Sequence, residues 1–117
     1  MRTSFSRFRI LNPARRAEIS VFCNATGCVG SYRPGDHLVL AYTCTLTGGA
    51  TATDAEFLER VFAMFNDHPE PNFPNDAAHT AAWYDSGLRS LSAGDVVAID
   101  GRHYACDSHG WVPLRTS

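Results

Sequence analysis

The sequence predicts an α+β domain in which a mostly antiparallel sheet packs on one main helix. Two strand-like segments come first, two helical segments follow, and the last third of the chain alternates short apolar runs with tight turns. Strands joined directly by turns pair antiparallel, whereas a doubly wound parallel sheet needs helices between successive strands. We therefore expect a C-terminal three-stranded meander, and the sequence leaves open whether the sheet curls into a small barrel.

Length and composition are those of one globular domain. A chain of 117 residues suffices for a single core, and 44% hydrophobic with 19% charged residues excludes a disordered or coiled-coil chain. No apolar run approaches the roughly 18 residues needed to cross a bilayer, and the N-terminus lacks the apolar stretch of a secretory signal. We expect a cytoplasmic protein without membrane contact.

The first 17 residues are predicted to form a basic arm ahead of a single domain over residues 18–117. All ten basic residues are arginine, and five of them precede the first acid, Glu18. This asymmetry is typical of an arm that touches nucleic acid or an acidic partner, or that folds back onto its own acidic body. The absence of lysine excludes Schiff-base chemistry. The candidate binding residues of the arm are Arg7, Arg9, Arg15 and Arg16.

Two strands are expected to open the domain. Residues 18–24 have the β-branched and aromatic content of a strand, a glycine-rich loop follows over residues 25–36, and residues 37–46 alternate large apolar and smaller side chains. This alternation predicts one long strand. The side chains expected on one of its faces are Leu38, Leu40, Tyr42, Cys44 and Leu46.

A capping box predicts the main helix, because Thr53 is followed three residues later by Glu56. The helix is expected to end before Asn66. Its predicted core face comprises Leu58, Val61, Phe62 and Phe65, flanked by Phe57 and Met64. Residues 67–76 hold three prolines and predict a surface loop, and a second, short helix is expected over residues 76–86, ended by Gly87.

The C-terminal meander is indicated by a hairpin signal, Asp100-Gly101, between two strand-like runs. Asp36 and Asp95 each follow a glycine just before an apolar strand. Short acidic side chains at such positions accept hydrogen bonds from nearby backbone amides. We expect both to cap turns rather than bind a ligand.

The segment over residues 89–114 resembles a group of small actinobacterial proteins of plasmid and phage type. It carries Ser-Leu-Ser-x-Gly-Asp-Val-Val, a hairpin, Tyr-x-Cys and then Gly-Trp. The stretch YRPGDHLVLAYT and the helix FLERVFAMFN are similar to upstream parts of the same group, so the resemblance covers about residues 32–114, and it extends more distantly to the YodL-type domain. It implies a mobile-element setting and supplies no catalytic residues.

The densest cluster of reactive side chains lies on the final hairpin: His103, Asp107 and His109, with Asp100 and Arg102. A base, an acid and a phosphate-binding cation are the parts of a small metal-independent ribonuclease, and an extended strand places His103 and Asp107 on one face. An ordinary solvated strand face has the same composition. Hydrolysis at this cluster is therefore an alternative to binding and not the main prediction.

The four cysteines allow three disulfide pairings, but nothing in the sequence indicates an oxidising compartment, so we expect free thiols. Cys44 and Cys106 fall at core positions of predicted strands, Cys106 on the same face as Tyr104. The alternative is a zinc site built on Cys23 and Cys28, whose spacing differs from the usual C-x2-C. We predict no metal and no cofactor.

A protein-interaction module is the main prediction for function. Aromatic and arginine side chains dominate binding hot spots, and the candidate aromatics are Phe73 and Trp83. Packing is the competing explanation, with Trp83 covering the sheet edge and Trp111 closing the sheet against the helix. The alternatives are nucleic-acid binding through the arm and the hydrolase above. An exposed edge strand could also pair two copies.

Overall fold

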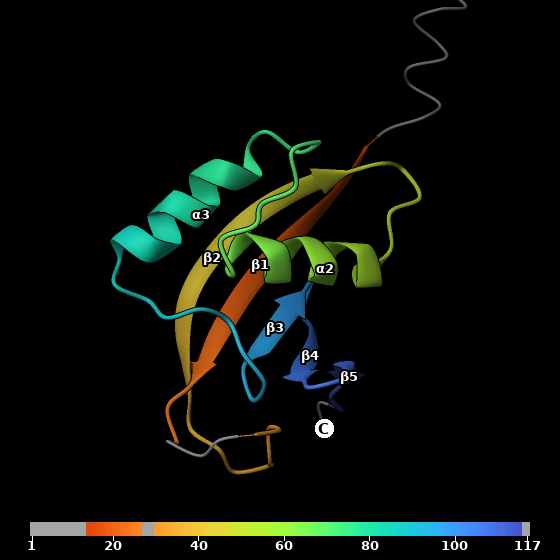
Figure 1. Cartoon of the computed structure of the whole chain (residues 1–117). Coiled ribbons are helices and arrows are strands. Elements are labelled where there is room, and N and C mark those ends of the chain that lie inside the picture. The colour runs from red at the N-terminus through yellow and green to blue at the C-terminus, as the bar shows by residue number, and fades with distance from the viewer. Residues whose placement is uncertain (1–13, 27–29, 116–117) are drawn as a thin grey trace, which may run out of the picture.

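The fold is one five-stranded antiparallel sheet with both helices on a single face. A computed structural model describes residues 14–26 and 30–115 (Figure 1). The strand order is β2-β1-β3-β4-β5, with every neighbouring pair antiparallel. The α+β prediction is confirmed. The sheet stays open, because β2 and β5 are its two edges. The strands are β1 (Arg15–Asn24), β2 (Leu38–Gly48), β3 (Val96–Ile99), β4 (Arg102–Asp107) and β5 (Gly110–Pro113).

The first strand begins three residues earlier than predicted. β1 starts at Arg15, whose Cα partner in β2 is Gly48. Arg15, Arg16 and Ala17 therefore belong to the sheet and not to an arm, and Ala17 is fully buried. The start of this strand is hard to recognise in the sequence, because Arg15 and Arg16 continue the series of arginines that precedes them. Residues 1–13 of the predicted arm, with Arg7 and Arg9, lie outside the described residues.

A β-bulge divides the long strand β2 into two parts. Val21 of β1 pairs with Tyr42, but the next residue, Phe22, pairs with Leu40, so Ala41 is the extra residue. An extra residue in one strand exchanges the two faces beyond it. The prediction of one continuous face is therefore right for Tyr42, Cys44 and Leu46 and wrong for Leu38 and Leu40. Leu40 lies on the face opposite the helices and is 54% exposed.

The main helix follows its sequence signals. α2 (Asp54–Met64) begins directly after its N-cap, Thr53, which forms the complete capping box with Glu56. After α3 (Asp76–Asp85), Gly87 adopts a left-handed conformation. Arg60, which lies outside the predicted core face, is buried, and Phe62, which was expected in the core, is 39% exposed. Neither helix in the described part of the chain is long and apolar enough to cross a membrane.

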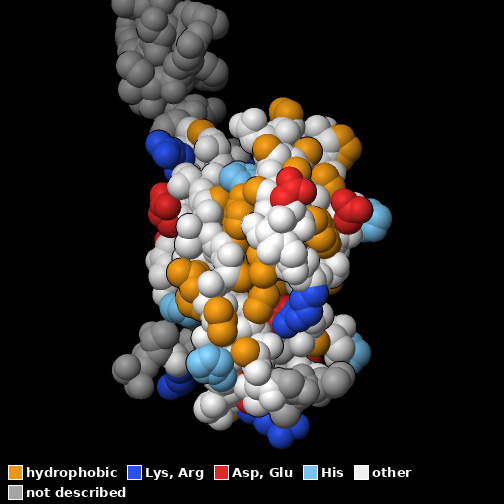
Figure 2. Space-filling view, turned by 90° about the vertical axis from the view of Figure 1, so that its left-hand side faces the viewer, with side chains coloured by type: hydrophobic (Ala, Val, Ile, Leu, Met, Phe, Trp, Pro, Cys, Tyr) orange, Lys and Arg blue, Asp and Glu red, His pale blue; other side chains and the backbone are white. Residues whose placement is uncertain are grey.

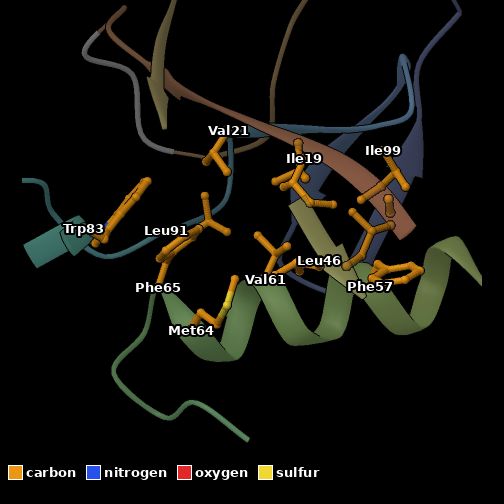
Figure 3. Close-up of a cluster of buried hydrophobic side chains, with 13 residues drawn as sticks. Ile19, Val21, Leu46, Phe57, Val61, Met64, Phe65, Trp83, Leu91 and Ile99 are labelled. Atoms are coloured by element: carbon orange, nitrogen blue, oxygen red, sulfur yellow. The ribbon is translucent and has the colours of Figure 1, made fainter. Parts of the chain in front are cut away.

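The core lies between the sheet and both helices (Figure 3). Trp83 of α3 stacks on Phe65 at the end of α2, with ring centroids 4.2 Å apart. Burying large apolar side chains contributes about 1.5–3 kcal/mol each, so this cluster is the main source of stability. Its fully buried members include Ile19, Val21, Phe57, Val61, Met64, Phe65, Trp83, Leu91 and Ile99.

The C-terminal meander is confirmed. Asp100 and Gly101 both have positive φ, as a two-residue hairpin of the preferred twist requires. The two predicted aspartate caps are also present. Asp36 accepts a hydrogen bond from the Arg33 backbone, and Asp95 accepts one from the Ser92 backbone. Asp95 is fully buried and also receives both guanidinium nitrogens of Arg89, so its role is structural.

Candidate functional site

The predicted catalytic residues of the final hairpin do not converge on one point. His103 and Asp107 share a strand face, but four residues of extended chain separate them by about 13 Å. Asp107 accepts a hydrogen bond from the Ser31 hydroxyl, and His109 lies in the exposed turn before β5. His103 packs beside Phe22, and its Nδ1 is buried without a hydrogen-bond partner among the described residues. His103 and Asp107 are therefore too far apart to act as acid and base on one substrate atom.

Arg102, the proposed phosphate-binding cation, is already held by a carboxylate. Its Nε and Nη2 donate to Asp54 at 2.7 and 2.9 Å, and the Tyr104 hydroxyl also donates to Asp54. These contacts, with Arg102 making the largest contribution, hold the pKa of Asp54 well below its usual value. The cluster joins the start of α2 to the β3–β4 hairpin. Its arrangement is that of a structural ion network.

The arginines of the predicted arm that are described do not form a free basic patch. Arg15 pairs with Asp54 at 2.8 Å and Asp100 at 3.2 Å, and its guanidinium lies 4.9 Å from the centre of the Phe57 ring. Arg16 is exposed on β1. Arg7 and Arg9 are outside the described residues, so nucleic-acid binding through them stays a prediction.

The cysteines are placed as core thiols. Burial raises the pKa of Cys44 to about 12 and that of Cys106 to about 11. Cys23 is partly buried, and burial raises its pKa as well. Cys28 lies outside the described residues. Over residues 14–26 and 30–115, no three His, Cys, Asp or Glu side chains come close enough to hold a metal ion.

The two candidate aromatics differ in their surroundings. Trp83 is fully buried and donates its indole N–H to the Arg89 carbonyl, so it cannot take part in an exposed patch. Trp111 packs edge-on against Phe62 of α2, as the packing explanation expects. Phe73 remains half-exposed beneath Arg60, with the guanidinium carbon 3.7 Å from its ring centre. Only Phe73 of this pair borders open surface.

The sequence predicts an exposed edge strand without identifying which strand it is, and the structure shows that β2 is an edge strand. The Arg60 side chain donates to the Thr47 carbonyl, so Thr47 points its backbone groups away from β1. Backbone orientation alternates along an antiparallel strand, and Thr43 and Thr45 therefore point their N–H and C=O groups the same way. Within the described residues, no group forms a hydrogen bond to the outward N–H and C=O groups of Thr43 and Thr45. They form an open row of donors and acceptors.

A groove runs along this edge. Its volume is about 440 Å³, and it separates Thr45–Thr47 of β2 from the N-terminal half of α3. The wall opposite β2 includes Ala78 and His79, and the His79 ring accepts or donates a 2.8 Å hydrogen bond with the Tyr42 hydroxyl. Phe73 also lines the groove.

A buried ion pair fixes the walls of the groove. Arg60 of α2 makes a two-pronged contact with Asp76 at the start of α3, at 2.8 and 3.1 Å, and both side chains are almost fully buried. The same guanidinium reaches Thr47 on β2. One residue therefore sets the distance between the helix wall and the strand wall.

The exposed part of β2 is apolar and without charge. The strand LVLAYTCTLTG contains no charged residue and no proline, and Val39 and Leu40 are 45% and 54% exposed. Figure 2 shows hydrophobic side chains gathered along the middle of the face on the side of β2 and α3. Edge strands usually carry charges or proline that block pairing with another chain. β2 carries neither protection, so its outer edge is open to pairing, but this composition does not by itself identify the strand as an edge.

No known protein family, curated protein or solved structure matches the chain.

Proposed function

We propose that this protein works by binding rather than catalysis, and that it binds an extended segment of another protein as an additional strand on β2. The observation that carries the proposal is the unpaired backbone of Thr43 and Thr45, together with the open groove that begins at Thr45. Strand addition satisfies such groups with main-chain hydrogen bonds, while alternate side chains of the ligand enter neighbouring pockets.

The chemistry of the edge defines the partner segment. β2 offers no charge, and the charges of Arg60 and Asp76 in the groove neutralise one another. A charged ligand side chain would lose hydration there without gaining a partner. The expected ligand is an uncharged run of about five to seven residues with β-branched or apolar side chains. Side chains at alternate positions enter the groove or cover Val39 on the helix side, and those between them cover Leu40 on the opposite face.

The setting of this binding is also part of the proposal. The described cysteines, Cys23, Cys44 and Cys106, are free thiols, which suits the reducing cytoplasm. The resemblance over residues 32–114 supports a role as an accessory factor of a plasmid or phage. The partner would then be another protein of the element or of its host.

A peptide-display selection tests the proposal directly. Selected peptides should share an uncharged alternating pattern, and Thr45→Pro should lower their affinity at least about tenfold, because proline removes one outward N–H. Thr45→Val is the matched control, since it loses the same hydroxyl but keeps the N–H. Methylation of alternate amides in a selected peptide should abolish binding as well.

The proposal fails if the selected peptides bind both variants equally, because their contacts would then be elsewhere. Native mass spectrometry supplies the second outcome. A dimer that Thr45→Pro dissociates would identify a second copy of this chain as the occupant of the edge, in place of a different protein.

A further inference from the structure

A second hollow lies on the other side of Arg60 from the β2 groove. Its volume is about 390 Å³, and the loop after β2 and the first two turns of α2 form its walls. The lining is mainly apolar, with Ala52, Ala55 and the Phe57 and Phe73 rings. Space of this size and character accommodates an aromatic side chain with parts of its neighbours.

The rim of this hollow is acidic. Glu56, Glu59 and Glu70 border it, and all three are exposed. The one cation among the lining residues, Arg60, is neutralised by its pair with Asp76. A ligand that matches the hollow therefore combines an aromatic or aliphatic group with flanking positive charges.

The described chain begins beside the hollow. Gly48, which lines it, is the Cα partner of Arg15, and the Arg15 guanidinium donates to the Ala52 carbonyl at 2.7 Å. Residues 1–13 thus join the domain next to this wall. An extended chain spans at most about 3.3–3.6 Å per residue, so a residue six positions before Ala14 reaches about 20 Å.

The preceding segment has the required chemistry. Phe8 stands between Arg7 and Arg9, and no acid occurs before Glu18. An aromatic ring with an arginine on each side complements an apolar hollow with carboxylates around it. Because the segment is part of the same chain, its contact with the hollow is intramolecular and gains from a high effective concentration.

We propose that the N-terminal segment of this chain is the occupant of this hollow, with Phe8 between the Phe57 and Phe73 walls and with Arg7 and Arg9 facing Glu59 and Glu70. The contact is made within one molecule. It uses a different surface from the β2 edge and does not depend on the proposed function.

Charge reversal in the full-length chain tests this docking. The wild-type protein should show nuclear Overhauser effects between the Phe8 ring and the Ala55 methyl group. Glu59→Arg with Glu70→Arg should remove them and speed trypsin cleavage after Arg7 and Arg9 about fivefold, as the loss of two exposed ion pairs implies. Asp85→Arg, at an exposed acid on α3 outside the hollow, controls for reversing the charge of a surface acid elsewhere and should leave both readouts unchanged.

A charge swap separates docking from general effects. Adding Arg7→Glu and Arg9→Glu to the two glutamate reversals should restore the Phe8 to Ala55 contact. The proposal is overturned if the wild-type chain lacks this contact, if the swap does not restore it, or if dilution removes it. Loss on dilution would show that the segment binds a second copy.

Discussion

Asp54, at the first position of α2, connects this helix to strands β1 and β4. It accepts hydrogen bonds from Arg15 of β1 and from Arg102 and Tyr104 of β4. A carboxylate at a helix N-terminus is further stabilised by the backbone dipoles. The sequence predicts the start of the helix but not this network, because the partners of Asp54 are far from it in the sequence. Arg15, Arg102 and Tyr104 lie 39, 48 and 50 residues away from Asp54.

The low pKa of Asp54 predicts how stability depends on pH. A carboxyl whose pKa is lower in the folded than in the unfolded chain stabilises the fold above the unfolded pKa of about 3.9, and this contribution disappears as the pH falls toward the folded value. Asp54→Asn should therefore cost about 1–2 kcal/mol of unfolding free energy at pH 7 and progressively less below about pH 4. Urea denaturation across this range measures the difference, with Asp85→Asn as the exposed control. A cost that stays constant down to pH 2 would show that charge is not its source.

The buried pair of Arg60 and Asp76 should be costly to break. Asp76→Ala leaves a guanidinium that is almost fully buried without its partner, which typically destabilises a protein by about 3–5 kcal/mol. Replacing both members, Arg60→Met with Asp76→Leu, should recover much of this loss because no buried charge remains. Urea denaturation at pH 7 gives both values. If Asp76→Ala costs less than about 1 kcal/mol, the pair does not hold α2 and α3 together.

Sequence signals predicted the elements whose ends are determined by interactions between residues close in the sequence. The Thr53 capping box, the Asp100-Gly101 turn and the left-handed Gly87 each act within a few residues, and each is present. The bulge at Ala41 depends on pairing with β1, so alternation along β2 alone could not indicate it. The same holds for Arg60, whose burial is due to Asp76 on another helix.

The two sides of β2 should respond differently to proline. At Thr45 the backbone N–H points away from the sheet, so Thr45→Pro should cost about 1 kcal/mol or less, whereas Cys44→Pro removes a hydrogen bond to β1 and should cost about 3 kcal/mol or more. Thermal or urea denaturation distinguishes the two. Equal losses would mean that the Thr45 amide is paired inside the fold.

For the whole molecule, the sequence predicts the α+β class, the meander and most of the core, because these follow from periodicity and turn chemistry. The candidate site is less predictable. Trp83 belongs to the core, Arg15 and Arg102 serve a structural network, and the catalytic candidates are spread along one hairpin. An open strand edge arises from the strand order, which places β2 outside β1, and no residue pattern within β2 specifies its neighbours.

Backbone amide exchange, residue by residue, tests the central claim most directly. In the free protein the amides of Thr43 and Thr45 should exchange rapidly, while those of Tyr42, Cys44 and Leu46 should be protected by their bonds to β1. A selected peptide should slow Thr43 and Thr45 and leave exchange at the far edge, β5, unchanged. Protection of Thr43 and Thr45 before any ligand is added, or no change when the peptide binds, would contradict strand addition at β2.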